Sequence, residues 1–252
     1  MSLLHPFEMI ALWCWYRGEG FHGYQGQGTL RTVQGELLRA FRLAGLTRNP
    51  VVAGRTDKGV SARMQVLSAR LERGAGLDGL AERLNAHLPP DLRIHLARPA
   101  PEGFHAAWSA SSKAYRYALS PEQLGDPALF ARAAALVPGT RDFRVFHFKT
   151  SLQMPRTVRT VELEPSAEGV TLRFEGDGFG RYMVRMLVGG LSAVARGLVP
   201  LEAFVAGLTE QRNFHCPTAP PEPLTLWEIG YPPQLDPFTP AERSAFAWPQ
   251  AR

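Results

Sequence analysis

Apolar residues in the first half of the chain follow strand-like and helix-like spacing in alternation. Residues 9–15 are apolar throughout, which predicts a buried strand. Val33, Leu37 and Phe41 then recur at helical spacing behind Thr32, whose hydroxyl can cap a helix N-terminus. Further strands are predicted at 51–53, 65–71 and 93–97, with a helix at 77–88 that ends before Pro89 and Pro90.

The second half repeats this order without a visible sequence repeat. It predicts strands at 114–119, 157–163, 170–174 and 226–229 and helices at 127–136 and 179–196. Each half thus approximates strand-helix-strand-strand-helix-strand, the order of ferredoxin-like and RNA-recognition folds. We therefore expect an α+β protein with two halves, residues 1–106 and 107–252. Eight prolines between residues 217 and 240 interrupt regular structure, so an irregular cover is expected beyond residue 232.

The bulk composition is that of a globular protein without export or metal-binding signals. The chain has 252 residues, of which 45% are hydrophobic and 20% charged, enough for one large or two small domains. Cys14 and Cys216 stand alone, with no partner at metal or redox spacing. The apolar run at 9–16 is too short to span a bilayer, and no charged leader precedes it. We expect a soluble cytoplasmic protein with reduced cysteines and no zinc.

Positive charge is concentrated near one segment of the chain. The net charge is +5, yet residues 31–73 alone carry nine basic side chains against three acidic ones, a local +6. A solvated basic face accounts for such a segment, and so does a phosphate-binding surface.

Within this segment, Asp57 occupies a glycine-bounded loop between two cations, Arg55 and Lys58. Gly54 and Gly59 permit backbone conformations and close approach that other residues resist. An aspartate has an ordinary pKa of about 3.9, and neighbouring cations favour its charged form, which suits a nucleophile better than a general acid. A turn aspartate that bonds its own backbone explains the same residues without any chemistry.

The run from Gly18 to Gly23 matches the spacing of a dinucleotide-binding motif. That motif needs a helix at its last glycine and an acidic residue about twenty positions later. Residues 24–29 predict a loop instead, and residues 37–56 contain no acid. We therefore expect no nucleotide cofactor.

The nine residues from Gly54 to Ala62 closely resemble the signature loop of the tRNA pseudouridine synthase I (TruA-type) family. Seven further motifs fall in that family's order, namely Tyr16 to Gln25, Thr32 to Leu37, Phe104 to Ala106, Tyr115 to Tyr117, Asp142 and Phe143 with Phe146, Met183 to Arg185 with Gly189, and Leu224 to Pro232. The chain departs from the family pattern at four positions. Arg17 stands where Asp is usual, Tyr24 where Trp is usual and Ala107 where Arg is common, and Lys58 replaces the Ala found in many bacterial members.

The resemblance implies two α/β halves whose largely antiparallel mixed sheets join, with a basic cleft between them. It implies an isomerase that turns uridine into pseudouridine at positions 38, 39 and 40 of the tRNA anticodon arm, acting as a homodimer without cofactor or metal. Asp57 would be the nucleophile, Arg185 its ion-pair partner, Tyr115 the residue that stacks on uracil and helps to remove its C5 proton, and Arg55 an orienting cation. Arg55, Lys58, Tyr115 and Arg181 would contact RNA.

Three alternatives remain open on the residues alone. Tyr115 and Tyr117 share one strand face and are both explained by core packing, while Arg185 can extend from its apolar helix to solvent. A non-catalytic RNA-binding or chaperone protein on the same fold is the alternative function.

Overall fold

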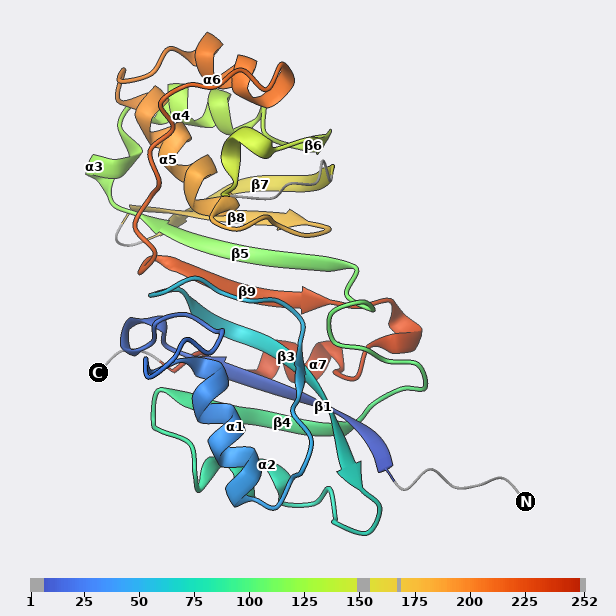
Figure 1. The fold of residues 1–252 in the computed structure, drawn as a ribbon. Helices are drawn as coiled ribbons and strands as arrows, with labels where there is room; N and C mark the ends of the chain where they lie inside the picture. Colours follow the sequence, from blue (N-terminus) through green and yellow to red (C-terminus); the bar gives the residue numbers. More distant parts are fainter. Residues whose placement is uncertain (1–6, 149–154, 167–168, 250–252) are drawn as a thin grey trace. The chain divides into compact units, whose positions relative to one another are not determined.

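The computed structural model describes residues 7–148, 155–166 and 169–249. The chain forms two compact units, of which the first comprises residues 1–111 and 228–252 and the second residues 112–227. Each unit is a sheet with helices packed against it (Figure 1). The predicted division into residues 1–106 and 107–252 stays a prediction about domains.

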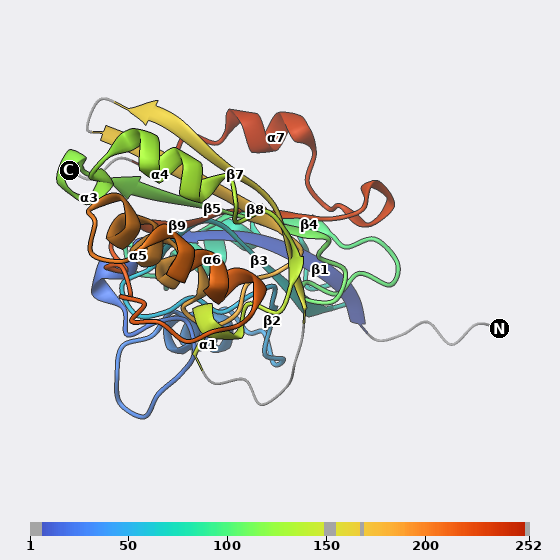
Figure 2. The same cartoon turned by 90° about the horizontal axis from the view of Figure 1, so that it is seen from above.

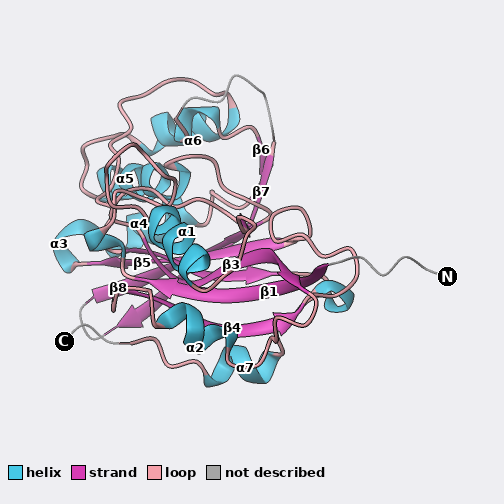
Figure 3. Ribbon diagram, turned by 60° about the horizontal axis from the view of Figure 1, so that its bottom comes forward, coloured by secondary structure: helices cyan, strands magenta, loops and turns pink. Residues whose placement is uncertain are grey.

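The first unit has the strand order β4-β1-β3, with β2 also paired to β3. The strands are β1 (Phe7–Tyr16), β2 (Val51–Val52), β3 (Ser61–Glu72) and β4 (Leu92–Pro99), and their pairings are antiparallel. Helix α1 (Val33–Leu43) lies over β1 and β3 (Figure 3), whereas α7 (Pro240–Ala245) lies on the opposite face (Figure 2). The predicted strand and helix order is confirmed for this unit.

Helix α1 begins where the sequence places its cap. The Thr32 hydroxyl accepts a hydrogen bond from the Gly35 amide at 3.2 Å, and Val33, Leu37 and Phe41 are buried. Helix α2 (Leu80–Asn85) is shorter than the predicted 77–88, because Gly79 adopts a left-handed conformation (φ 69°) directly before it.

The second unit has the strand order β5-β8-β7-β6. These strands are β5 (Ser112–Leu119), β6 (Gly139–Arg141), β7 (Arg156–Ser166) and β8 (Gly169–Gly176), again paired antiparallel. The helices are α3 (Pro121–Leu124), α4 (Pro127–Ala134), α5 (Met183–Ala195) and α6 (Leu201–Thr209). Strand β9 (Leu224–Gly230) has residues 224–227 in this unit and the rest in the first. The predicted α+β class with largely antiparallel sheets is confirmed.

Beyond residue 232, where the sequence predicts an irregular cover, the chain also forms the six-residue helix α7. Pro240 occupies the first helical turn, where a missing amide hydrogen costs nothing, and Thr239 and Glu242 form a reciprocal capping box. A proline is expected to interrupt regular structure, but Pro240 at the first turn starts this helix.

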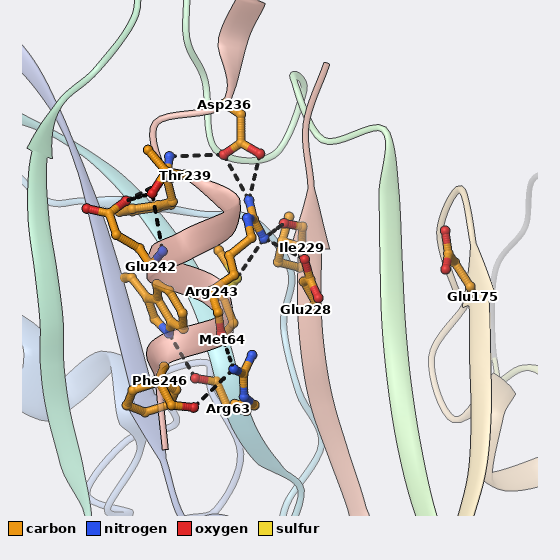
Figure 4. A network of polar contacts seen from close by, with 12 residues as sticks. Arg63, Met64, Glu175, Glu228, Ile229, Asp236, Thr239, Glu242, Arg243 and Phe246 are labelled. Carbon is orange, nitrogen blue, oxygen red and sulfur yellow. Dashed lines mark hydrogen bonds and ion pairs between the residues drawn. The ribbon is translucent and has the colours of Figure 1, made fainter. Parts of the chain in front are cut away.

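A largely buried arginine side chain attaches this C-terminal segment to the rest of the first unit. The Arg243 side chain is 11% exposed, and its guanidinium donates to both carboxylate oxygens of Asp236 at 2.8 Å and to Glu228 at 2.8 Å (Figure 4). Its backbone carbonyl accepts a 2.6 Å bond from Arg63 of β3. Bonds between charged groups are shorter and stronger than neutral ones, so they hold the segment firmly. Arg63 is buried here, so it does not belong to the basic surface expected from residues 31–73.

No helix in the described parts of the chain combines the length and the apolar character that crossing a bilayer requires.

Candidate active site

The loop that carries Asp57 connects β2 to β3 in the first unit. Asp57 is half-buried, Arg55 and Lys58 are exposed, and Thr56 between them is buried. The Thr56 and Tyr16 hydroxyl oxygens lie 2.8 Å apart, and the Tyr16 oxygen also accepts a 3.3 Å bond from the Gln65 amide nitrogen. Gln65 further donates to the Gly54 carbonyl at 2.6 Å. A buried polar network therefore fixes the loop on the side of the sheet.

A second loop, residues 17–25, holds the Asp57 loop from its other side. The Tyr24 amide donates to the Thr56 carbonyl at 3.0 Å, and the Gly59 amide donates to the Phe21 carbonyl at 3.4 Å. The approach is so close that a Cβ on Gly18 would overlap the backbone of Val60. These glycines therefore let two loops pack backbone to backbone, and α1 starts only at Val33, so the run at 18–23 is not built like a dinucleotide-binding turn.

The turn after Asp57 completes the positioning of its backbone. The Val60 amide donates to the Asp57 carbonyl at 3.2 Å, and Gly59 has a φ of 81°, the left-handed conformation that glycine tolerates best. The prediction that Gly59 shapes this loop is confirmed. Burial raises the pKa of the nearby Tyr24 hydroxyl, while the positive charge of Arg55 acts in the opposite direction. Tyr24 is therefore neutral at physiological pH.

The second unit carries the other predicted site residues on β5 and around the start of α5. Tyr115 is 8% exposed, and its ring meets Phe179 edge to face, with centroids 5.3 Å apart at 82°. Tyr117, on the same face of β5, is fully buried, as expected for a core residue. Burial raises the pKa of Tyr117 to about 12, which the charge of Arg185 opposes. Arg185 thus lies close to the face of β5 that carries both tyrosines.

Helix α5 begins at Met183 and not at Phe179 as predicted. Tyr182 precedes it in a left-handed conformation (φ 63°), one of two such non-glycine residues in the described parts of the chain. The Tyr182 ring contacts the guanidinium of Arg181, with Cζ 4.9 Å from its centroid, and that of Arg185, at 5.0 Å. Sequence reasoning missed Tyr182, because nothing in a tyrosine side chain signals a left-handed backbone.

Arg185 is half-buried, and both its side chain and its backbone bond the segment that follows α6. Its Nε donates to the Ala219 carbonyl at 2.8 Å, and its own carbonyl accepts from the Ala219 amide at 3.0 Å. Arg181, one turn earlier, is exposed and donates to the Tyr182 hydroxyl at 3.2 Å.

The predicted residues thus form two groups, each within one unit. Arg55, Asp57 and Lys58 share one loop of the first unit, whereas Tyr115 on β5 and Arg181 and Arg185 around the start of α5 belong to the second unit. The pairing of Asp57 with Arg185 stays a prediction.

The polar network of Tyr16, Thr56 and Gln65 that holds the Asp57 loop is not among the features predicted from the sequence. The sequence feature that could have indicated it is Gln65, a polar residue within an apolar stretch of β3 that is fully buried in the structure. In the described residues no group of three or more histidine, cysteine or acidic side chains is arranged to hold a metal ion.

Known proteins are similar to this chain over most of its length. A family model described as tRNA pseudouridine synthase matches residues 133–232. The tRNA pseudouridine synthase A of Paraburkholderia phymatum is 35% identical over 247 residues, covering 88% of this chain and 91% of the relative. The enzyme of the same name from Methanothrix thermoacetophila is 33% identical, covering 88% of this chain and 83% of the relative. The one from Burkholderia mallei is 32% identical, covering 95% of each.

The chain therefore belongs to the tRNA pseudouridine synthase family, and it is an enzyme of that class. The predicted family is confirmed.

Proposed function

We propose that this protein isomerises uridine to pseudouridine at positions 38, 39 and 40 of the tRNA anticodon arm, with Asp57 as the nucleophile. Family membership supports the reaction and its tRNA substrate. The observation that carries the role of Asp57 is the way its loop is held, by buried bonds from Tyr16 and Gln65 on one side and by backbone bonds from residues 21–24 on the other. A reacting carboxylate works best when its surroundings prevent it from moving.

The reaction breaks the bond between ribose C1′ and uracil N1 and forms a bond between C1′ and C5. The C5 proton leaves and N1 gains a proton, so atoms and charge balance. Asp57 stabilises the cleaved fragment covalently, at either the sugar or the base. Arg185 pairs with Asp57 and keeps it ionised.

Tyr115 is proposed to stack on the target uracil and to take part in removing the C5 proton. Its contact with Phe179 supports this role, because an edge-to-face neighbour fixes the plane of the tyrosine ring. Only a small part of the side chain is exposed, which suits a residue that meets one flipped base.

A base inside a stem cannot reach a carboxylate, so the target uridine has to leave its stack. Arg55, Lys58 and Arg181 are all exposed at the two groups of site residues. We propose that they contact phosphates and the displaced nucleotide, in a basic cleft between the two halves, and that affinity for tRNA falls as salt rises. We further propose a cytoplasmic homodimer that needs no cofactor or metal, with domains at residues 1–106 and 107–252.

Mapping pseudouridine in unmodified tRNA transcripts tests this proposal. Wild-type protein should convert uridines 38, 39 and 40 and leave other uridines unchanged. Conversion elsewhere would contradict the assigned positions. Salt-sensitive tRNA binding with no pseudouridine formed would instead identify a non-catalytic RNA-binding protein.

A further inference from the structure

We propose that Trp108 and His105 form a stacking platform for an unpaired nucleobase of the bound tRNA, away from the target uridine. The proposal rests on the proposed function in that it takes tRNA as the substrate. The indole of Trp108 is 86% exposed, the most exposed large hydrophobic side chain in the described residues.

The two rings are arranged as a flat pair. Their centroids lie 4.1 Å apart and their planes differ by 9°. His105 therefore covers one face of the indole and leaves the other open. Stacking on one open ring face is the way single-stranded nucleic acid is bound by aromatic side chains.

His105 is held in place by the backbone around it. Its Nδ1 accepts hydrogen bonds from the amides of Ala107 at 3.2 Å and Trp108 at 3.1 Å. Because Nδ1 is an acceptor, the neutral ring carries its proton on Nε2. The His105 amide in turn donates to the Ser109 hydroxyl at 3.0 Å, and the Ser109 amide donates to the His105 carbonyl at 2.9 Å.

Ala106, which lies between His105 and Trp108 in the chain, attaches their loop to the rest of the first unit. The Ala106 amide donates to the Ser68 hydroxyl of β3 at 3.2 Å, and the Ala106 carbonyl accepts from the Tyr231 hydroxyl at 2.8 Å. The rings of Phe104 and Tyr231 pack together, with centroids 5.1 Å apart. The indole is thus presented from a fixed backbone, and little conformational entropy is lost when a ligand stacks on it.

The short loop around Trp108 favours a nucleobase over a protein partner. The residues that flank Trp108 in the chain are small, Ala107 and Ser109, so along this loop the indole has none of the large apolar neighbours found at the core of a protein interface. Arg70 is exposed on β3, two residues beyond Ser68 and on the same face, where it can meet a phosphate.

The turn that carries Asp57 lies at the other end of β3 from the platform. The Asp57 carbonyl accepts from the Val60 amide at 3.2 Å, and Ser61, where β3 begins, is seven positions from Ser68, about 23 Å at the usual rise of a strand. The nucleotide bound here is therefore not the target uridine, and the platform contributes to affinity for the whole tRNA.

Trp108→Ala and Trp108→Phe test the proposal through tRNA affinity, with single-turnover rates at saturating tRNA measured beside it. Trp108→Ala should weaken tRNA binding about tenfold and leave the saturated rate unchanged, and Trp108→Phe should retain most of the affinity. His105→Ala should give an intermediate loss. The thermal midpoint should not change in Trp108→Ala, since the side chain is exposed.

Unchanged tRNA affinity in Trp108→Ala would overturn the proposal. Dissociation of an oligomer in Trp108→Ala, measured by light scattering, would also overturn it, because a second copy of the chain would then cover the indole. Affinity is measured independently of turnover, so an inactive wild-type protein would contradict the proposed reaction while leaving the affinity comparison decisive.

Discussion

The guanidinium of Arg185 lies over the ring of Tyr182, with Cζ 5.0 Å from the ring centroid, while its Nε bonds the Ala219 carbonyl at 2.8 Å. Tyr182 achieves this position at the cost of a left-handed backbone, with φ at 63°. Strain of this kind persists where the surrounding structure requires it, and it concentrates at functional sites. We infer that Tyr182 positions Arg185.

Tyr182→Ala and Tyr182→Gly separate positioning from stability. Both remove the ring, so both should lower the turnover rate about tenfold to a hundredfold with little change in tRNA affinity. Glycine relieves the backbone strain, so Tyr182→Gly should be more stable to urea than Tyr182→Ala by about 1 kcal/mol.

Gln211 provides the matched control, because it is the other left-handed non-glycine residue of the described chain (φ 54°). Gln211→Gly should gain similar stability over Gln211→Ala without any change in rate. Recovery of activity in Tyr182→Gly along with its stability would show that Tyr182 acts through stability alone.

Gly18→Ala should displace the Asp57 loop. A methyl group there overlaps the Val60 backbone, which has to move, at a cost of about 1–3 kcal/mol in the free energy of unfolding. Initial rates of pseudouridine formation should fall more than stability alone explains. Gly26→Ala is the control, since its nearest new contact is an ordinary 3.6 Å to the Gln34 side chain. Equal effects of the two substitutions would contradict the close packing of the two loops.

The hydroxyls of Tyr16 and Thr56 should be energetically coupled. Thr56→Val or Tyr16→Phe leaves one buried oxygen without its 2.8 Å partner, at a cost of about 1–3 kcal/mol each. Once one hydroxyl is gone, removing the other should cost less, so the two effects should not add in a double-mutant cycle of urea unfolding. Additive effects would mean that the hydroxyls stabilise the loop independently.

A feature of the fold could be predicted where it follows from the residue types and their spacing in the sequence. Helix α1 could be predicted because the capping threonine and the helical spacing of apolar residues indicate the same helix, and both can be read from the sequence. Tyr182 could not, since its conformation is imposed by neighbours in the fold. Pro240 was misjudged because the same ring breaks a helix interior and starts a helix at its first turn.

The same distinction applies to the candidate site. Asp57 stood out because glycines and cations surround it, and the family resemblance supplied Tyr115 and Arg185. The bonds from Tyr16 and Gln65 could not be predicted, because they join residues that are far apart in sequence. Arg17, where the family usually has Asp, lies with its Cζ 6.0 Å from the Trp248 ring centroid and donates to the Pro249 carbonyl. Its role in the fold is thus to bind the C-terminal segment.

Stability should decrease in mild acid because of His95. Burial, and then the charges of Arg63 and Arg98, lower its pKa from the ordinary value of 6.5, although Glu242 opposes this. The neutral ring packs between Trp13 and Phe246, with centroids 4.8 and 4.3 Å away. The unfolded chain therefore binds a proton first, so this contribution is complete above pH 6.5 and is lost as pH falls below it.

His95→Phe should reduce the loss of thermal midpoint between pH 7.5 and pH 5.5. His147, whose pKa is also lowered, chiefly by burial, contributes in the same direction and remains in the variant, so the difference from wild type isolates His95. An identical pH dependence in both proteins would contradict a neutral, half-buried His95.

Tritium release from tRNA that carries 5-tritiated uridine measures the central claim most directly, with wild type compared to Asp57→Asn. Asparagine keeps the shape of the side chain but is a poor nucleophile without a negative charge. The account predicts that wild type releases tritium, and that Asp57→Asn binds the same tRNA with similar affinity and releases none. Release at the wild-type rate by Asp57→Asn would contradict the role of this carboxylate.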